Sequence, residues 1–409
     1  MILDRRLAAK WQERQRTIRG VSLRYMLLPC IATIFQFVKL WSVSEFGRLD
    51  FRIYYEAVDT NSAASLYNFK YKILGLGFTY PPLTALLLRP LTLLGLVTAE
   101  RIWFTVSLAL FVWFAHRCAR LLPHTNNLVK SLACAFIIVS MPVTLTLRFG
   151  QINAVIGALL MVDLLLVMRP ASRLSGIGLG LAAAIKVTPA YLGLVFGAAG
   201  RLRHAIVAGT TAIVATLAAA AVLPGSSKDY WTSVLYDTDR VGNVNTKFNN
   251  SLRRIVSWLH LSDGASTAIW IVVSIVVTVV VISKVRKSFA ADNLLAAYAV
   301  ASIGGYLVSP ISWGHHLLFL GPAVALVVGD GRSWERWLCA LPAIFVVLDP
   351  LEGGEGNWLS AGRILFMVLV VAFLPVDSPH GAAATTPPTR RWSNAAARYK
   401  TMAMRSSAR

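Results

Sequence analysis

Residues 47–82 read GRLDFRIYYEAVDTNSAASLYNFKYKILGLGFTYPP, and they come shortly after the first strongly apolar run of the chain, residues 25–41. An apolar run of this length is sufficient to cross a bilayer as a helix. The stretch that follows is too polar to lie in lipid, yet it is rich in Tyr and Phe. It therefore indicates a chain that crosses a membrane and then lays an aromatic segment along the interface. Asp50 lies near the start of that segment, close to the expected membrane edge, with Arg52, Tyr54 and Tyr55 directly behind it.

Asp50 has two interpretations at this point. A carboxylate where a helix bundle opens to water can act as a general base on an incoming hydroxyl group. It can equally be a solvated side chain, or the partner of Arg48 or Arg52 in a surface ion pair.

The composition indicates a polytopic membrane protein. Of 409 residues, 56% are hydrophobic and only 14% are charged, and the mean hydropathy is +0.60. Soluble domains carry about 25% charged residues. The length allows ten or more spans of roughly 20 residues, and we expect an all-α protein with about 10–13 transmembrane helices, some of them short or re-entrant. The four cysteines lie in or beside apolar runs and have no metal-ligand spacing, so they predict neither a disulfide framework nor a metal site.

The formal charge of +21 is distributed as membrane topology requires. Basic residues gather in the N-terminal segment 1–24, in short loops and in the tail 376–409, which suits cytoplasmic segments better than a nucleic-acid-binding face. We therefore expect both termini in the cytoplasm, a transmembrane domain at 25–375, a disordered tail, and no nucleic-acid partner. The same reasoning places the loops 42–80 and 224–266 on the outer face, with Asp50 in the first of them.

Two apolar segments carry a cation beside a proline. Arg89 precedes Pro90 within residues 80–97, and Lys186 stands three residues before Pro189 within residues 174–199. A cation at mid-bilayer costs roughly 3 kcal/mol or more. Each segment is therefore expected either to be broken or to turn its cation into a polar cavity.

Further polar residues gather on the predicted outer face. His315 and His316 follow Trp313 in SPISWGHH, residues 309–316, and we expect them in the first turn of a new helix, where anions are favoured. Because adjacent helical residues diverge by about 100°, one imidazole is expected to face the cavity; interfacial caps are the alternative. The other candidates for substrate contacts interrupt apolar runs or lie in an Asn-rich loop, and structural roles remain open for all of them: Gln151, Asn153, Lys186, Asn249, Asn250 and Ser251.

The sequence lacks a Walker loop, a glycine-rich dinucleotide motif and a DxD pair. A sugar donor used on the outer face, where nucleotides are absent, would have to be linked to a lipid.

Six stretches together resemble a known family: LDFRIYYEAV at 49–58, FTYPPL at 78–83, FGQIN at 149–153, KVTP at 186–189, NNS at 249–251 and SPISWGHH at 309–316. The chain resembles the actinobacterial GT-C glycosyltransferases of family 87, which are polyprenol-phosphate-mannose-dependent α-mannosyltransferases, from about residue 20 to 375.

The resemblance implies a GT-C fold in the plasma membrane and a β-mannosyl phosphoryl polyprenol as donor. It implies a mannosylated phosphatidylinositol as glycolipid acceptor, an α-(1→2) linkage formed by inversion at the periplasmic or extracellular face, and no cofactor. Asp50 is then the general base, and we expect His315 or His316 and Lys186 to stabilise the departing phosphate. Arg52, Tyr54, Tyr55, Tyr80 and Trp313 join the polar residues above as expected substrate contacts.

Other functions remain open on the sequence. The acceptor of a mannosyl- or arabinosyltransferase could be lipomannan or lipoarabinomannan. A polyprenol or glycolipid flippase would use a similar bundle but needs no outer carboxylate for chemistry. A proton-coupled transporter would want paired acidic residues within its spans, and Asp163 is nearly alone there.

Overall fold

The computed structural model describes residues 23–41, 47–59, 66–72, 75–123, 125–169, 172–237, 240, 242–349 and 357–376. Every regular element in these ranges is a helix, as the composition predicted. The predicted basic segment 1–24 and the basic tail 376–409 lie almost entirely outside the described residues.

The helices follow one another with short connections. In chain order they are η1 (Leu23–Met26), α2 (Leu27–Trp41), α3 (Leu49–Asp59), η2 (Leu66–Asn68), α4 (Pro82–Leu88), η3 (Arg89–Leu93), α5 (Leu96–Arg120), α6 (Asn127–Val139), α7 (Met141–Phe149), α8 (Asn153–Val167), α9 (Ile177–Ile185), α10 (Ala190–Ala198), α11 (Leu202–Val222), α12 (Pro224–Thr232), η4 (Val234–Tyr236), α13 (Leu252–Ser257), α14 (Asp263–Ala290), α15 (Leu294–Val308), η6 (Gly314–His316), α16 (Leu320–Val328), α17 (Trp334–Leu348) and α18 (Asn357–Phe373).

Several helices are apolar enough to cross a membrane. Among the described residues, four are also long enough: α5, α6 and α7 taken together as residues 127–149, α11 and α14. Shorter apolar helices accompany them at residues 27–41, 82–93, 153–167, 294–308 and 358–373. The architecture is therefore that of a polytopic membrane protein, while the exact number of complete spans stays a prediction.

Both segments that carry a cation beside a proline are broken. In the first, α4 ends at Leu88 and continues only as the 3₁₀ turn η3, which leaves Arg89 exposed. In the second, α9 ends at Ile185 and α10 begins at Ala190, so that Lys186 has an extended backbone. Proline explains these ends, since it cannot donate the backbone hydrogen bond that a continuing helix needs.

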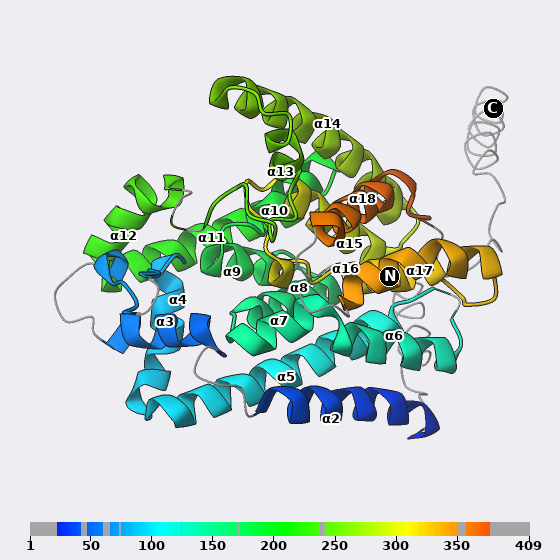
Figure 1. Cartoon of the computed structure of the whole chain (residues 1–409), viewed down its shortest axis with the longest axis horizontal. Helices are drawn as coiled ribbons and strands as arrows, with labels where there is room; N and C mark the ends of the chain where they lie inside the picture. The colour runs from blue at the N-terminus through cyan, green and yellow to red at the C-terminus, as the bar shows by residue number, and fades with distance from the viewer. Residues whose placement is uncertain are drawn as a thin grey trace, which may run out of the picture.

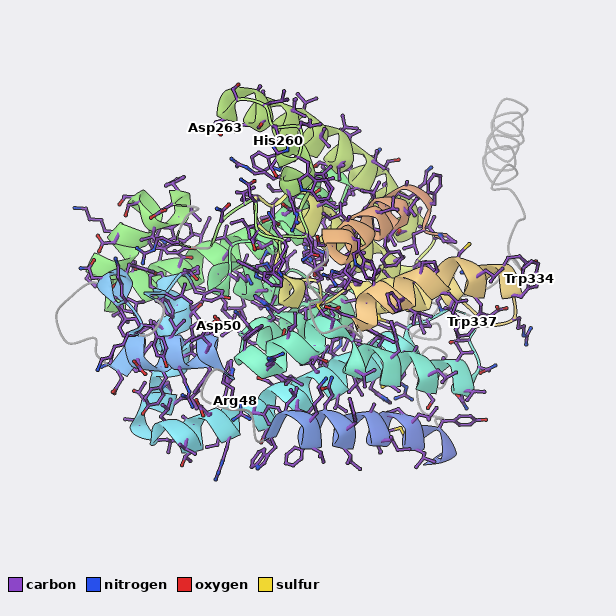
Figure 2. All side chains as sticks on the ribbon, in the orientation of Figure 1. Arg48, Asp50, His260, Asp263, Trp334 and Trp337 are labelled. Carbon is purple, nitrogen blue, oxygen red and sulfur yellow. The ribbon has the colours of Figure 1, made fainter. Side chains whose placement is uncertain are left out.

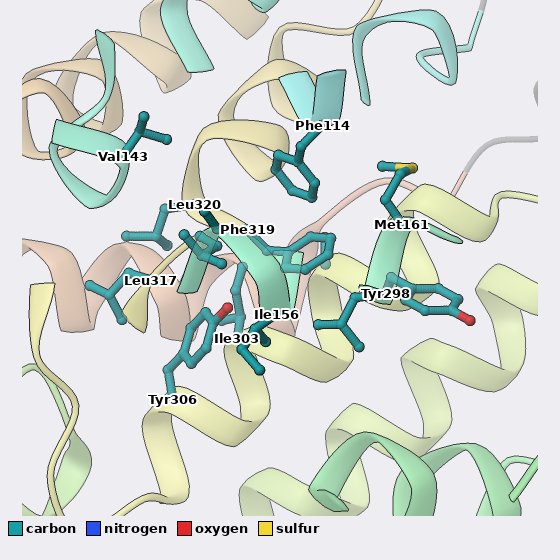
Figure 3. Packing of buried hydrophobic residues seen from close by; sticks show 14 of the residues in the cluster. Phe114, Val143, Ile156, Met161, Tyr298, Ile303, Tyr306, Leu317, Phe319 and Leu320 are labelled. Carbon is teal, nitrogen blue, oxygen red and sulfur yellow. The ribbon is translucent and has the colours of Figure 1, made fainter. Parts of the chain in front are cut away.

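The core forms where α15 and the chain after η6 meet α5 and α8. Figure 3 shows Phe319 between Phe114 and the side chains of Ile156 and Ile303, and the rings of Phe114 and Phe319 meet edge to face at 5.5 Å between centroids. Almost every residue of α15 is buried, which is the pattern of a helix surrounded on all sides.

The buried carboxylate of Asp163 connects four helices, α8, α9, α11 and α15. Asp163 of α8 accepts hydrogen bonds from the Gly176 amide, from His204 Nε2 at 2.7 Å and from the Tyr298 hydroxyl at 2.6 Å. These partners come from the start of α9, from α11 and from α15. Because a buried charge requires such partners, Asp163 is accounted for as a structural node.

Helix α9 is packed unusually closely between its neighbours. A Cβ atom at Gly178 would lie 2.4 Å from the Leu159 carbonyl oxygen of α8, and one at Gly180 would lie 2.4 Å from the Ala208 carbonyl oxygen of α11. Glycine is therefore required at both positions. The short helix that ends directly before Lys186 is consequently held rigidly between α8 and α11.

Figure 1 shows how the outer elements are arranged. Helices α3, α4 and α12 gather at the left end of the bundle, α2 and α5 run along one side, and α14 projects from the other. Helix α3 is the regular element of the predicted first outer loop, and its buried side chains Phe51, Ile53, Tyr54, Ala57 and Val58 form one apolar face.

The packing of α9 predicts a specific loss of stability. Gly180→Ala should lower the unfolding temperature of the detergent-solubilised protein by overpacking, an effect worth about 1–3 kcal/mol. The measurement is a thermal unfolding scan. Gly193→Ala is the matched control, because its Cβ would meet nothing closer than 4.0 Å; equal behaviour of the two variants would contradict the close contact.

Candidate active site

Helix α3 carries Asp50 in its first turn, and Arg48 fixes where that helix begins. Arg48 has a left-handed backbone, φ 61°. Its amide donates to the Arg148 carbonyl, and its guanidinium donates to the carbonyls of Leu40 and Trp41 at 3.1 and 3.2 Å. The start of α3 is therefore tied to the end of α2 and to α7. Figure 2 shows Arg48 and Asp50 in this region, far from Trp334 and Trp337 on α17.

The two arginines beside Asp50 have other partners. Arg52 Nε lies 2.5 Å from Glu100 Oε1, and Arg48 binds backbone carbonyls. Neither forms a recorded ion pair with Asp50 among the described residues. The simple interpretation of Asp50 as a surface ion-pair partner is therefore not supported by the geometry.

Gln151 supplies the hydrogen bond that Asp50 receives. Its Nε2 atom donates to Asp50 Oδ2 at 2.6 Å. Its Oε1 atom accepts from the Tyr54 and Tyr80 hydroxyls at 2.9 and 2.7 Å. Since two hydroxyl donors occupy the amide oxygen, the amide nitrogen has to face the carboxylate. Gln151, Tyr54 and Tyr80, which were predicted as substrate contacts, thus form a hydrogen-bonded frame that orients Asp50, the predicted base.

Lys186 brings an amino group to the same site, and burial lowers its pKa to about 7 against the opposing effect of the charge on Asp50. Its Nζ atom donates to Asn153 Oδ1 at 3.1 Å and lies 5.3 Å from the centre of the Tyr80 ring. Asn153 in turn donates to the His315 carbonyl at 2.9 Å. The helix break after α9 therefore places the predicted cation beside the chain segment that carries the histidines.

The two histidines face different spaces. Their rings are 4.6 Å apart and nearly perpendicular. His315 lines a large groove together with Arg148 and Phe149, whereas His316 lines a small cavity of about 30 Å³ together with Lys186 and Asn153. The sequence-based expectation that they begin a helix is wrong, because they form the separate 3₁₀ turn η6 and α16 starts only at Leu320.

Burial sets the charge state of the site. Loss of water raises the pKa of Asp50 to about 6, against the opposing effects of the Gln151 hydrogen bond and of the charge on Lys186. Burial also lowers the pKa of both histidines well below its usual value, with Lys186 adding to the effect. Near neutral pH the site therefore holds a carboxylate and two neutral imidazoles, which can donate hydrogen bonds.

The Asn-rich stretch at residues 249–251 is hydrogen-bonded to residues 310–312, just before the histidines, and does not face solvent. Asn249 donates to the Pro310 carbonyl and accepts from the Ser312 amide at 3.0 Å, Asn250 donates to the Ser312 carbonyl, and the Ser251 hydroxyl donates to Pro310. All three side chains are buried. The geometry gives them the role of holding residues 310–312 in place.

Three other predicted contacts lie around the site. The Tyr55 hydroxyl donates to the Leu94 carbonyl at 2.6 Å. Arg52 is held by Glu100. Trp313 is partly exposed beside the His315 groove.

The structure also adds residues that were not nominated from the sequence. Arg48 and Glu100 organise α3, and Arg148, Asp349 and Arg363 line the groove beside His315. The sequence indicated these residues only weakly, since each is a single charge at the edge of an apolar segment.

Comparisons with known proteins agree with this architecture. Residues 78–310 match the sequence profile of glycosyltransferase family 87. The chain is 32% identical over 283 residues to a polyprenol-phosphate-mannose-dependent alpha-(1-2)-phosphatidylinositol mannoside mannosyltransferase of Mycobacterium tuberculosis, covering 66% of this chain and 65% of that protein. It is 32% identical over 349 residues to a polyprenol-phosphate-mannose-dependent alpha-(1-2)-phosphatidylinositol pentamannoside mannosyltransferase of Mycolicibacterium smegmatis. This match covers 80% of this chain and 84% of that protein. The chain thus spans a little under two thirds of the first of these relatives. No solved structure was found to match.

The Gln151 frame predicts the titration of Asp50. Gln151→Met removes the hydrogen bond to the charged carboxylate and should raise the pKa of Asp50 above about 6. Infrared difference spectroscopy of the carboxyl band against pH measures this shift. Gln36→Met is the control, because Gln36 is buried but bonds Ile138 and Thr144. A pKa of Asp50 that stays unchanged in Gln151→Met would contradict the frame.

Proposed function

Because the chain belongs to glycosyltransferase family 87, we propose that it is an inverting mannosyltransferase of the outer face of the plasma membrane. It transfers mannose from polyprenyl-phosphate-mannose to a mannosylated phosphatidylinositol and forms an α-(1→2) linkage. The observation that carries this proposal is the carboxylate of Asp50, which is oriented by a neutral amide and has no arginine partner within the described part of the chain.

The chemistry follows from that carboxylate. Asp50 takes the proton from the acceptor hydroxyl as its oxygen forms a bond to the anomeric carbon. The bond from that carbon to the phosphate oxygen breaks at the same time, and its electron pair leaves with the polyprenyl phosphate. Attack from the face opposite the phosphate turns a β-linked donor into an α-linked product. General-base assistance of this kind contributes about 10²–10⁴ in rate.

The departing phosphate needs positive charge and hydrogen-bond donors. Lys186 and His316 line one cavity, and they are assigned here to the phosphate of the donor. His315 faces the neighbouring groove and supports the turn that carries His316. Because phosphate is a good leaving group, this scheme requires no general acid.

The names of the relatives support the choice of substrates. Both are described as polyprenol-phosphate-mannose-dependent and as acting on phosphatidylinositol mannosides. A lipid-linked donor also agrees with a polytopic membrane bundle that contains several apolar helices.

Removal of the base should abolish transfer. Asp50→Asn keeps the size of the side chain and its contact with Gln151 but cannot accept the proton, so the rate should fall by about 10²-fold or more. The assay uses radiolabelled polyprenyl-phosphate-mannose and a phosphatidylinositol mannoside, with the linkage of the product determined.

Asp59→Asn is the matched control, since Asp59 ends the same helix and is exposed. It should transfer mannose at the wild-type rate. Substantial transfer by Asp50→Asn, or movement of lipid without a new glycosidic bond in the wild-type protein, would overturn the proposal.

The pKa of Asp50 predicts the acid limb of the pH profile. Asp50 acts only when it is deprotonated, so activity is present above about pH 6 and is lost as pH falls through this value. Below it, kcat/KM should decline about tenfold per pH unit. Initial rates between pH 4.5 and 8 at subsaturating acceptor test this, and a midpoint near the ordinary aspartate pKa would contradict it.

A further inference from the structure

A large groove runs along α2, α6 and α7 and ends beside the active site. Its volume is about 1110 Å³. Its walls are apolar along most of its length, with Ile31 and Phe35 of α2 and Leu132 of α6 each more than two fifths exposed. Apolar side chains that remain exposed along a groove in a membrane bundle suit a lipid chain.

One face of α7 gives the groove its direction. Met141, Thr144, Leu145 and Arg148 follow the i, i+3, i+4, i+7 pattern and all line it. The apolar residues come first and the arginine last. The groove therefore changes from apolar to cationic toward the end of α7, three residues before Gln151.

Arg148 stands at this polar end with an exposed guanidinium. Its guanidinium lies 6.0 Å from the centre of the ring of its neighbour Phe149, and it forms no ion pair with any other described residue. A guanidinium next to an apolar groove is well suited to bind a lipid phosphate.

A carboxylate with unused hydrogen-bonding capacity lies at the same end. Asp349 follows α17 with φ 47° and is 8% exposed. Its Oδ2 atom lies 3.5 Å from Arg363, and its buried Oδ1 atom has no hydrogen-bond donor in the described parts of the chain. Arg363 is held by Asn250. A buried acceptor of this kind is costly unless a donor reaches it.

We propose that this groove is the binding site of the acceptor glycolipid. The lipid chain lies along α2, α6 and α7, its phosphate pairs with Arg148, and hydroxyls of its headgroup donate to Asp349 while a sugar ring packs on Trp313. The assignment rests on the proposed function, and it names where the acceptor binds and which residues select it.

Two lipid-linked substrates need two sites, and the groove suits the acceptor. The phosphate of the acceptor headgroup meets Arg148, and its hydroxyls meet Asp349. The donor phosphate is already assigned to Lys186 and His316, which line a separate cavity.

The location agrees with the chemistry of the base. The polar end of the groove includes Arg148 and Phe149, and Gln151, two residues further on, bonds Asp50. A headgroup that extends past this turn brings a sugar hydroxyl to the base, and Asp50 has to contact the acceptor rather than the donor.

The first experiment measures equilibrium binding to the full-length protein in detergent. A labelled phosphatidylinositol mannoside reports the acceptor and a labelled polyprenyl phosphate reports the donor. Arg148→Gln should weaken binding of the mannoside about tenfold, the loss expected for one charge-assisted hydrogen bond, and leave polyprenyl phosphate within about twofold. Arg101→Gln is the matched control, because Arg101 is also exposed and near an aromatic ring, that of Trp41, but does not line the groove.

A second pair of variants tests the apolar part. Ala135→Trp fills the groove on α6 and should weaken mannoside binding and raise the KM for the acceptor, with the KM for the donor unchanged. Ala218→Trp places the same side chain on an exposed position of α11 and should change neither. Asp349→Asn should weaken binding of the mannoside more than that of phosphatidylinositol without sugar.

The binding assays do not depend on turnover, so failure of the proposed reaction and failure of the groove assignment are distinguishable. Loss of polyprenyl phosphate binding in Arg148→Gln or Ala135→Trp, with mannoside binding intact, would assign the groove to the donor and overturn the proposal. Unchanged binding of both lipids in these variants would overturn it as well.

Discussion

The hydrogen bond from Gln151 to Asp50 depends on the two tyrosines behind it. An amide can present either its oxygen or its nitrogen to a neighbour. The hydroxyls of Tyr54 and Tyr80 occupy the oxygen, so the nitrogen faces the carboxylate. A carboxylate that has lost water would otherwise be protonated near neutral pH. With one good donor and the Lys186 amine nearby, its pKa lies at about 6, a value that suits the proposed role of general base near neutral pH.

The site is assembled from segments that are distant in sequence. Asp50 and Tyr54 come from α3, Gln151 and Asn153 from the turn between α7 and α8, and Lys186 from the break after α9. Contacts between helices fix the positions of these residues. Arg48 ties α3 to α7 through backbone carbonyls, and the close packing of α9 against α8 and α11 fixes the position of Lys186. Such fixed geometry is what catalysis by positioning and electrostatics requires.

The two histidines of η6 line two different spaces, the large groove and the small cavity. As consecutive residues of η6 they point in different directions, one toward the groove and the other toward the cavity of Lys186. The Asn249–Ser251 stretch holds the preceding residues, 310–312. The proposed reaction joins two lipid-linked substrates that need separate binding sites, and this turn lies between the groove and the cavity.

The sequence by itself determined the all-helical membrane architecture, because apolar runs of bilayer length and scarce charge leave no other arrangement. It also singled out the segments around Arg89 and Lys186 as either broken or turned toward a polar cavity, since a cation beside a proline is costly inside a continuous span. Asp50, Gln151, Asn153 and Lys186 were candidates for one site. Only the tertiary structure decided what those residues contact. Whether Arg52 pairs with Asp50 or with Glu100, whether the Asn249–Ser251 side chains face solvent or the backbone of residues 310–312, and whether Arg148 and Asp349 share a groove all depend on packing between distant helices. Local sequence does not encode those distances, because each of these side chains can reach several partners and the fold selects among them.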